Sequence, residues 1–255
     1  MTGRPLFVGI AGGSGSGKTH FARDVATGVG LERVAMLSMD QYFRSNPTER
    51  DSRDINFDHP AHLDFRLMSS HLRKLKKGTT IVAPSYDFRA MVQTPNAIEI
   101  EPKPVVVVEG LFVLAQPMVE LFDITIFLDV DPDQRLLGRI LRDARERGAS
   151  IEELVDRYQR FVRPSYDVFV APTKQNADIV VDFTYRRILL TKMLTLQLRS
   201  FADEGLDLEG FSEELRAECH HLGFTPREGS MPVSIDILKL ARDYPESASS
   251  TPALR

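Results

Sequence analysis

Cysteine is almost absent from this sequence: Cys219 is the single one among 255 residues. An internal disulfide is therefore excluded, and no Cys/His cluster has the spacing of a structural metal site. Apolar runs are also short, and none approaches the ~20 residues of a membrane-spanning helix. Residues 1–5 are too short and too polar for a secretory signal. These absences lead us to expect a cytoplasmic protein.

An excess of positive charge is lacking as well. The 32 Lys and Arg residues are outnumbered by 36 Asp and Glu residues, which gives a formal net charge of −4. No overall field favours nucleic acid or an anionic membrane, so we expect neither as a partner. The chain has no internal repeat, and its length suits one large α/β domain with or without a small appendage. The sequence leaves a homo-oligomer open.

Short apolar runs alternate with segments of helical spacing along most of the chain. This alternation predicts βαβ units, and hence a five-stranded parallel sheet with helices on both faces. The predicted parallel strands are residues 6–10, 34–39, 105–108, 124–130 and 179–181. The main predicted helices are residues 18–29, 61–77, 133–147 and 151–162. Two further short strands, 79–83 and 97–100, enclose a loop that contains Tyr86 and predict a small β-hairpin lobe.

The character of the chain changes near residue 189, which divides it into three predicted parts. Residues 1–188 form the main α/β domain, and residues 189–244 form a helical extension with helices at 190–202, 212–221 and 234–243. Residues 245–255 are rich in Ser, Pro and Ala, and we expect them to be disordered. No chemistry is assigned to the last two parts. The polar segment 44–58 is long for a connection, as loops that close over a ligand are.

A phosphate-binding motif follows the first predicted strand. Its eight residues match G-x-x-x-x-G-K-[ST] and are Gly12, Gly13, Ser14, Gly15, Ser16, Gly17, Lys18 and Thr19. Glycines let the backbone N–H groups turn inward to cradle phosphates, and the next helix adds its positive end. In this motif Lys18 reaches the β- and γ-phosphates and the Thr19 hydroxyl is a magnesium ligand. A flexible glycine linker would not lie between an apolar strand and a helix.

The surrounding sequence narrows the class of phosphate-loop protein. A GTPase needs a guanine-reading N/T-K-x-D, and residues 173–176 read Thr-Lys-Gln-Asn instead. A motor or transporter ATPase would be longer than 255 residues. The chain is therefore expected to be a small-molecule kinase that uses ATP and Mg²⁺.

Carboxylates follow or end several predicted strands, and ligands bind at that edge of a parallel sheet. Asp40 could accept a proton from an attacking hydroxyl or orient it, although it could also be a turn or helix-cap residue. Glu109 follows the 105–108 strand, where a carboxylate commonly holds magnesium, often through water. It could also be only a charged residue at a strand exit. Asp129 is a weaker rival for the metal.

Five arginines lie on the predicted 133–147 helix, and they are Arg135, Arg139, Arg142, Arg145 and Arg147. Positions 135, 139 and 142 share one face, where like charges repel unless anions meet them. A lid that clamps phosphates supplies such anions and neutralises charge during transfer. The alternative is a solvated face paired with Asp143 and Glu146.

Taken in order, several segments resemble the uridine kinase family (uridine–cytidine kinases, related to phosphoribulokinase). The resemblance covers about seven-tenths of the chain, from Leu6 to Val181. Besides the phosphate-binding motif, it rests on Ser38-Met39-Asp40, Asn56-Phe57-Asp58-His59-Pro60, Tyr86-Asp87-Phe88, Val108-Glu109-Gly110, Leu141-Arg142-Asp143, Glu146-Arg147-Gly148, Val162-Arg163-Pro164 and Pro172-Thr173-Lys174.

The resemblance implies a phosphate-loop kinase fold with an arginine lid, and phosphorylation of a nucleoside 5′-hydroxyl. It implies that Asp40 takes the hydroxyl proton and that Asp58 holds ribose hydroxyls. It further implies that aromatic side chains surround the base, that one arginine contacts the substrate and that two lid arginines lie near the phosphates. The aromatic side chains are Tyr86 and Phe88, the substrate-contacting arginine is Arg139, and the two lid arginines are Arg142 and Arg147.

The chain departs from the family pattern mainly where the base is read. Met91 replaces a histidine, Ala149 an arginine, Arg157 a glutamine and Phe43 a tyrosine, and residues 182–184 replace a Pro-Arg-Gly segment. A kinase of the same fold for another nucleoside or sugar-like alcohol is therefore an alternative. A nucleotide-gated binding protein without turnover is another.

Overall fold

The computed structural model describes residues 4–45, 55–88, 90–147, 150–204 and 225–226. Its centre is a sheet in the order β2 (Val34–Ser38), β5 (Val105–Glu109), β1 (Leu6–Gly12), β6 (Ile124–Asp129), β7 (Ile179–Asp182) and β8 (Thr225–Pro226). The first five strands are parallel, which confirms the predicted five-stranded parallel sheet. The two-residue β8 pairs antiparallel with β7 and was not predicted.

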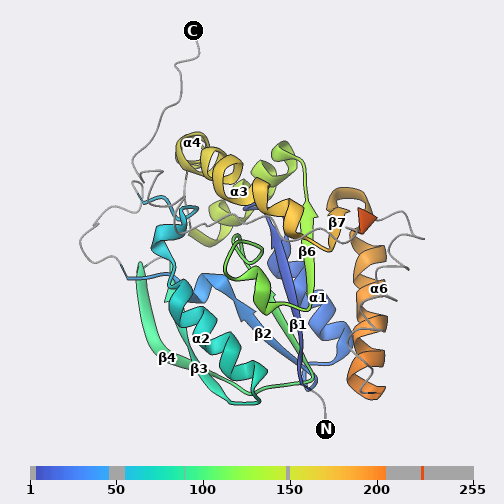
Figure 1. Cartoon of the computed structure of the whole chain (residues 1–255). Coiled ribbons are helices and arrows are strands. Elements are labelled where there is room, and N and C mark those ends of the chain that lie inside the picture. The colour runs from blue at the N-terminus through green and yellow to red at the C-terminus, as the bar shows by residue number, and fades with distance from the viewer. Residues whose placement is uncertain (1–3, 46–54, 89, 148–149, 205–224, 227–255) are drawn as a thin grey trace.

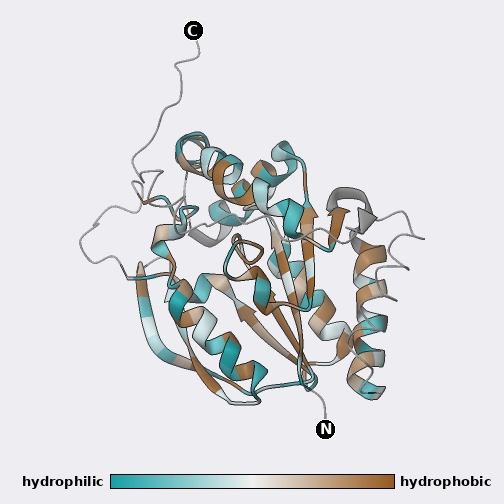
Figure 2. Cartoon of the chain, in the orientation of Figure 1, coloured by the Kyte–Doolittle hydropathy of each residue, from teal (hydrophilic) through white to brown (hydrophobic). Residues whose placement is uncertain are grey.

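Both faces of this sheet are buried, and the four consecutive valines of β5 show how. Val106 and Val108 pack into one core cluster, while Val105 and Val107 pack into the other. Successive side chains of a strand point to opposite faces, so an unbroken apolar run is what a strand covered on both sides requires. Figure 2 shows the central strands mostly in the hydrophobic colour, whereas the helices around them alternate.

Helices cover the two faces in separate groups (Figure 1). On one face, α1 (Lys18–Val29) packs beside α6 (Phe183–Glu204). On the other face lie α2 (Phe65–Lys76) and the hairpin of β3 (Ile81–Asp87) and β4 (Val92–Ile100). Across the end of the sheet to which the β6 arrowhead points run α3 (Pro132–Arg147) and α4 (Ile151–Arg157). No helix in the described part of the chain is long and apolar enough to cross a membrane.

The hairpin is more extensive than predicted. Its strands were expected at 79–83 and 97–100, but the antiparallel pairing continues to Asp87 and Val92, so Tyr86 lies in β3 rather than in a loop. Residues 92–99 of β4 are exposed or only partly buried, so its sequence lacks the apolar alternation that marks a half-buried strand. Backbone pairing with β3, rather than side-chain burial, extends it.

Two predicted helices differ at their ends. The helix expected from residue 61 begins as α2 at Phe65, because the Asp64 carboxylate accepts a hydrogen bond from the Leu67 N–H at 2.9 Å and caps it. Residues 60–62 form a separate 3₁₀ turn. The helix expected over 151–162 is α-helical only to Arg157. Two wider π turns on either side of a short α turn, α5 (Arg163–Ser165), and then a 3₁₀ turn continue the chain to Asn176.

The predicted boundary between residues 188 and 189 falls inside α6. This helix starts at Phe183, directly after β7, and contains the helix expected at 190–202. Leu190, Leu194 and Leu198 are at most 1% exposed and belong to the same core cluster as α1. The start of the predicted extension thus packs as part of the main domain. The helices predicted at 212–221 and 234–243 and the tail 245–255 lie outside the described residues.

A short 3₁₀ turn, η1 (Met39–Tyr42), follows β2 and carries Asp40. The Tyr42 hydroxyl lies 3.0 Å from His71 Nδ1 on α2, and both side chains are buried. Burial raises the pKa of the Tyr42 phenol, so it stays protonated and can donate this hydrogen bond. Burial, followed by the charge of Lys74, lowers the pKa of His71, although Asp64 opposes this, so the imidazole stays neutral and can accept. This bond fixes the turn on the helix.

The core position of α6 makes a first prediction. Leu198→Ala should lower the free energy of unfolding by roughly 2–5 kcal/mol, because it leaves a cavity at a fully buried site. Leu196 on the same helix is 67% exposed, and Leu196→Ala should change that free energy by less than about 0.5 kcal/mol. Urea denaturation of both variants is the measurement. Equal losses would mean that α6 is not part of the core.

The lowered pKa of His71 makes a second prediction. A histidine whose pKa is depressed on folding stabilises the protein above its unfolded pKa of about 6.5, and that contribution is lost as pH falls through the folded value. The free energy of unfolding should therefore drop more steeply from pH 7.5 to 5 in the wild type than in His71→Gln. Urea denaturation across this range, with the exposed His20→Gln as control, tests it. Parallel curves for wild type and His71→Gln would contradict the assignment.

Candidate active site

The phosphate-binding motif lies between the end of β1 and the start of α1, as predicted from the sequence. Gly15 has φ 81°, and a Cβ added there would lie 2.2 Å from the backbone oxygen of Arg135 on α3. At Gly13 an added Cβ would lie 2.4 Å from Arg135 Nη1. The glycines therefore serve two purposes: they allow the turn, and they let the lid helix approach the loop closely.

Lys18 is folded back over this loop. Its Nζ donates a 3.0 Å hydrogen bond to the Gly13 carbonyl, and the side chain is buried. Burial lowers the pKa of the ammonium, while the charges of Glu109 and Asp40 act in the opposite direction. A desolvated cation among carboxylates, at the start of a helix, is suited to receive an anion.

Three oxygen-bearing side chains meet where β2, β5 and α1 come together. Glu109 Oε1 accepts hydrogen bonds from Ser38 Oγ at 2.6 Å and from Thr19 Oγ1 at 3.2 Å. Hydroxyl and carboxylate oxygens are hard ligands of the kind Mg²⁺ prefers, so the donor set fits that ion. Nowhere among the described residues do three or more His, Cys, Asp or Glu side chains gather into a metal site. A cation here would need phosphate or water oxygens as well.

Ser38 was not singled out by the sequence analysis. The signal that could have found it is strand register: Ser38 lies opposite Glu109 in the parallel pairing of β2 with β5. Asp129, the predicted rival for the metal, is instead paired with Lys174.

Asp40 is an exposed residue of η1, beside these groups. The turn is capped by Ser38, whose Oγ accepts from the Asp40 N–H at 3.3 Å, while the Gln41 side chain accepts from the Ser38 N–H at 3.1 Å. Asp40 is thus not the cap itself. Its negative charge acts on Lys18 of the phosphate loop and on Arg142 of α3.

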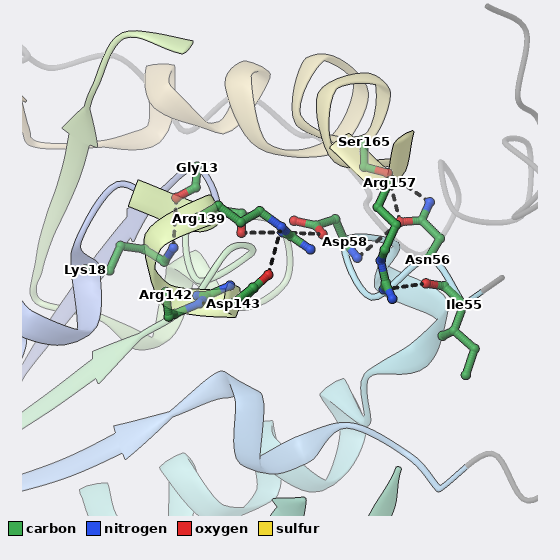
Figure 3. Close-up of polar contacts among 11 residues, drawn as sticks. Gly13, Lys18, Ile55, Asn56, Asp58, Arg139, Arg142, Asp143, Arg157 and Ser165 are labelled. Carbon is green, nitrogen blue, oxygen red and sulfur yellow. Dashed lines mark hydrogen bonds and ion pairs between the residues drawn. The ribbon is translucent and has the colours of Figure 1, made fainter. Parts of the chain in front are cut away.

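Two arginines of the predicted lid, Arg139 and Arg142 on α3, are paired with buried carboxylates (Figure 3). Arg139 Nη1 lies 3.1 Å from Asp58 Oδ2, and Arg139 Nε lies 3.4 Å from Asp143 Oδ2. Arg142 Nε donates to Asp143 Oδ1 at 2.8 Å. Asp143 is only 2% exposed, so the expected alternative of a solvated face does not describe it. The side chain of Arg147 lies outside the described part of the structure, as does Ala149.

Arg135 has a different environment from the other two. Its guanidinium carbon lies 3.7 Å from the centre of the Tyr166 ring, and its Nε donates to the Val130 carbonyl at 3.0 Å. It packs against the glycines of the phosphate loop, as described above. Arg135 therefore fixes the start of the lid on the loop.

Asp58 is held by its own segment. Its backbone N–H donates to Asn56 Oδ1 at 3.1 Å, and the Asn56 amide donates to Ser165 Oγ at 3.0 Å. Arg157 approaches the same segment and donates to the Ile55 carbonyl at 3.3 Å (Figure 3). These contacts fix the position of a carboxylate that faces the lid.

Four aromatic rings gather beside this segment: Phe43, Phe57, Tyr86 and Phe88. The Tyr86 and Phe88 centroids are 4.9 Å apart, and Phe43 lies 5.4 Å from Phe88. The sequence analysis assigned no role to Phe57. Its position directly before Asp58 could have indicated that its ring lies at the site. Met91 is half-buried against the same core cluster and has φ 56°, an uncommon conformation for its type.

Charge at the site is balanced. Six charged residues are buried in the described structure, and all of them belong to this region: Lys18, Asp58, Glu109, Arg135, Arg139 and Asp143. Buried charges are tolerated when they are paired, and they concentrate where function requires them. The structure thus brings together the predicted residues Lys18, Thr19, Asp40, Asp58, Glu109, Arg139 and Arg142, with Tyr86 and Phe88 in the adjoining aromatic group.

Comparison with known proteins agrees with this arrangement. Residues 7–187 match the Phosphoribulokinase / Uridine kinase family. A uridine kinase of Clostridium perfringens (strain SM101) is 40% identical over 70% of this chain and 87% of its own length. A uridine kinase of Brevibacillus brevis is 37% identical over 76% of this chain and 92% of its own.

A solved structure described as a possible uridine kinase from Bacillus stearothermophilus has a TM-score of 0.52 and 19% identity, over 71% of this chain and 91% of its own. At 19% identity this similarity shows the fold alone. The family match, by contrast, covers well over half of the sequence. The chain therefore belongs to the phosphoribulokinase/uridine kinase family and is an ATP-dependent kinase.

Proposed function

We propose that this kinase transfers the γ-phosphate of ATP to the 5′-hydroxyl of a pyrimidine nucleoside, uridine or cytidine, in nucleoside salvage. The observation that carries the proposal is the contact between Arg139 and Asp58, which joins the lid over the phosphate loop to a carboxylate beside an aromatic group. A sugar that carries a base needs these two features side by side. Relatives named uridine kinase, such as those at 40% and 37% identity, support the same substrate class.

The nucleotide phosphates would bind the backbone of residues 12–19, with Lys18 moving from the Gly13 carbonyl to the β- and γ-phosphates. Magnesium would be held by Thr19 and by Glu109, the latter through water, and Ser38 orients the Glu109 carboxylate. Bound there, the ion would neutralise charge on the phosphates.

Asp40 would orient the acceptor hydroxyl and take its proton, because it is an exposed carboxylate whose charge acts on both Lys18 and Arg142. Arg142 and Arg147 would stabilise negative charge on the transferring group. Asp143 supports this role by holding Arg142 through Nε, which leaves the terminal nitrogens to face the phosphates.

On the acceptor side, Asp58 would accept hydrogen bonds from the ribose hydroxyls, and Arg139 would orient that carboxylate and contact the substrate. Tyr86 and Phe88, with Phe43 and Phe57, would enclose the base through ring contacts. Ring contacts recognise any planar base, so they supply affinity more than discrimination.

A second candidate is a kinase of the same fold for another nucleoside or sugar-like alcohol. It is favoured by Met91, whose thioether is only a weak hydrogen-bond acceptor, at the tip of the hairpin beside the aromatic group. Binding without turnover is the third alternative.

One experiment separates the three. ADP formation is measured with purified full-length protein, MgATP and a panel of pyrimidine nucleosides, purine nucleosides and sugars, with Lys18→Ala as the blank. We expect uridine or cytidine to have the highest kcat/KM. A better non-pyrimidine acceptor would support the second candidate, and ATP binding without ADP formation on any acceptor would support the third.

Asp40→Asn gives a prediction specific to proton transfer. The variant should bind ATP as the wild type does and lose roughly 10²- to 10⁴-fold in kcat, the range of general-base contributions. Asp156→Asn on the outer side of α4, where Asp156 pairs with Arg160 at 3.2 Å, is the matched control and should keep the wild-type rate. A loss in Asp40→Asn below about tenfold would mean that Asp40 only shapes the turn.

Met91→His tests the base pocket. Histidine adopts positive φ more readily than methionine and can hydrogen-bond to a base edge, so it should raise kcat/KM for uridine or cytidine by roughly two- to tenfold. The informative quantity is that value divided by kcat/KM for the best non-pyrimidine acceptor. Met91→Leu, which adds no hydrogen-bonding group, is the control. A ratio that stays flat or falls in Met91→His would argue that the pocket is built for something else.

A further inference from the structure

The side chain of Ser14 makes a contact that is not required for phosphate binding by the backbone N–H groups of the loop. Its hydroxyl accepts a 2.7 Å hydrogen bond from Arg139 Nη1, across 125 residues of sequence. The same nitrogen donates to Asp58 Oδ2 at 3.1 Å. A guanidinium Nη carries two hydrogens, so Nη1 gives one to each partner and has none left.

The Arg139–Asp58 part of the bridge lies out of water, and Ser14 is half-buried. The side chains of Arg139 and Asp58 are 6% and 8% exposed. Arg139 therefore has little access to solvent, and a buried donor left unpaired is costly. Figure 3 shows Arg139 reaching from the lid between the phosphate loop and Asp58.

The remaining hold on Arg139 is weaker. Its Nε is 3.4 Å from Asp143 Oδ2, and the buried Nε has no hydrogen-bond partner. Ser14 is therefore one of the two groups that fix the end of a long, flexible side chain. Without the Ser14 hydroxyl, the guanidinium can turn toward Asp143, and Asp58 loses the partner that orients its carboxylate.

We propose that Ser14 is a positioning residue for the phosphate acceptor: from within the nucleotide loop, its hydroxyl holds Arg139 and, through it, the Asp58 carboxylate that receives the acceptor. The proposal rests on the proposed function in one respect, namely that Asp58 binds acceptor hydroxyls. It separates two contributions of one residue, because the Ser14 backbone serves the nucleotide while its side chain serves the other substrate.

The test is a KM comparison. Ser14→Ala keeps the backbone and removes only the hydroxyl, so it should raise the KM for the acceptor roughly two- to tenfold, the effect of one net hydrogen bond, and leave the KM for ATP unchanged. The acceptor used is the best substrate of the panel described above. Ser14→Thr retains a hydroxyl and should restore the acceptor KM.

Ser16→Ala is the matched control. It removes a hydroxyl from the same loop, and the Ser16 Oγ is buried with no hydrogen-bond partner in the described structure. Because the Ser16 hydroxyl makes no hydrogen bond to Arg139, the variant should leave the acceptor KM unchanged, whatever its effect on the KM for ATP as part of the nucleotide loop. A Ser14→Ala protein with a raised ATP KM and a normal acceptor KM would overturn the proposal, as would a Ser14→Thr protein that behaves like Ser14→Ala.

A double-mutant cycle tests whether the effect passes through Arg139. In an Arg139→Lys background, where the forked donor is gone, Ser14→Ala should add no further change in acceptor KM. Fully additive effects would overturn the proposed route. Failure of the proposed function can be distinguished from failure of the Ser14 proposal. If the best acceptor is not a pyrimidine nucleoside, the assay uses that acceptor instead, and the comparison between the variants stays the same.

Discussion

Charge held out of water is the constraint on which this structure depends. Three basic and three acidic side chains are buried at the carboxyl edge of the sheet, and burial costs several kcal/mol for each unless it is compensated. Ion pairs of Arg139 with Asp58 and Asp143 supply part of the compensation. Hydrogen bonds of Lys18 and Arg135 to backbone carbonyls, and of Glu109 to the Thr19 and Ser38 hydroxyls, supply the rest. The site is close to neutral, so the polyanionic phosphates of ATP would leave it negative. A magnesium ion bound with them would offset part of that charge.

The parts of the fold that follow from local pattern could be predicted from the sequence. Four consecutive valines required a strand covered on both faces, and glycines between a strand and a helix required a phosphate loop. Glu109 and Asp40 were found because parallel strands end at the same edge. Ser38 was not, because its partner Glu109 is 71 residues away and the contact depends on strand register. The contacts of Arg139 with Ser14 and Asp58 depend on how α3 packs over the phosphate loop, and no local sequence pattern predicts that packing.

The predicted ends of several helices and strands were wrong for the same reason, because they depend on contacts between segments that are distant in the sequence. The exposed strand β4 has no apolar alternation, so its length depends on backbone pairing with β3. The start of α6 at Phe183 shows that a change in composition near residue 189 does not mark a change in packing, because Leu190 and Leu194 continue the core begun by α1. In the acceptor pocket, the sequence identified changed positions such as Met91, but only the structure places it in a left-handed conformation at a hairpin tip.

The close approach of α3 to the phosphate loop gives that helix two faces with different tolerance of change. A Cβ at Gly138 would lie 2.9 Å from the Gly15 carbonyl, and one at Gly15 would lie still nearer to the Arg135 carbonyl. Larger side chains at these positions would push helix and loop apart. Leu137 and Leu141, by contrast, are 54% and 55% exposed. Redesign of the helix for a bulkier substrate can therefore use outward positions such as Leu137 and Leu141, while Gly138 and the arginines that face the loop and Asp58 have to remain as they are.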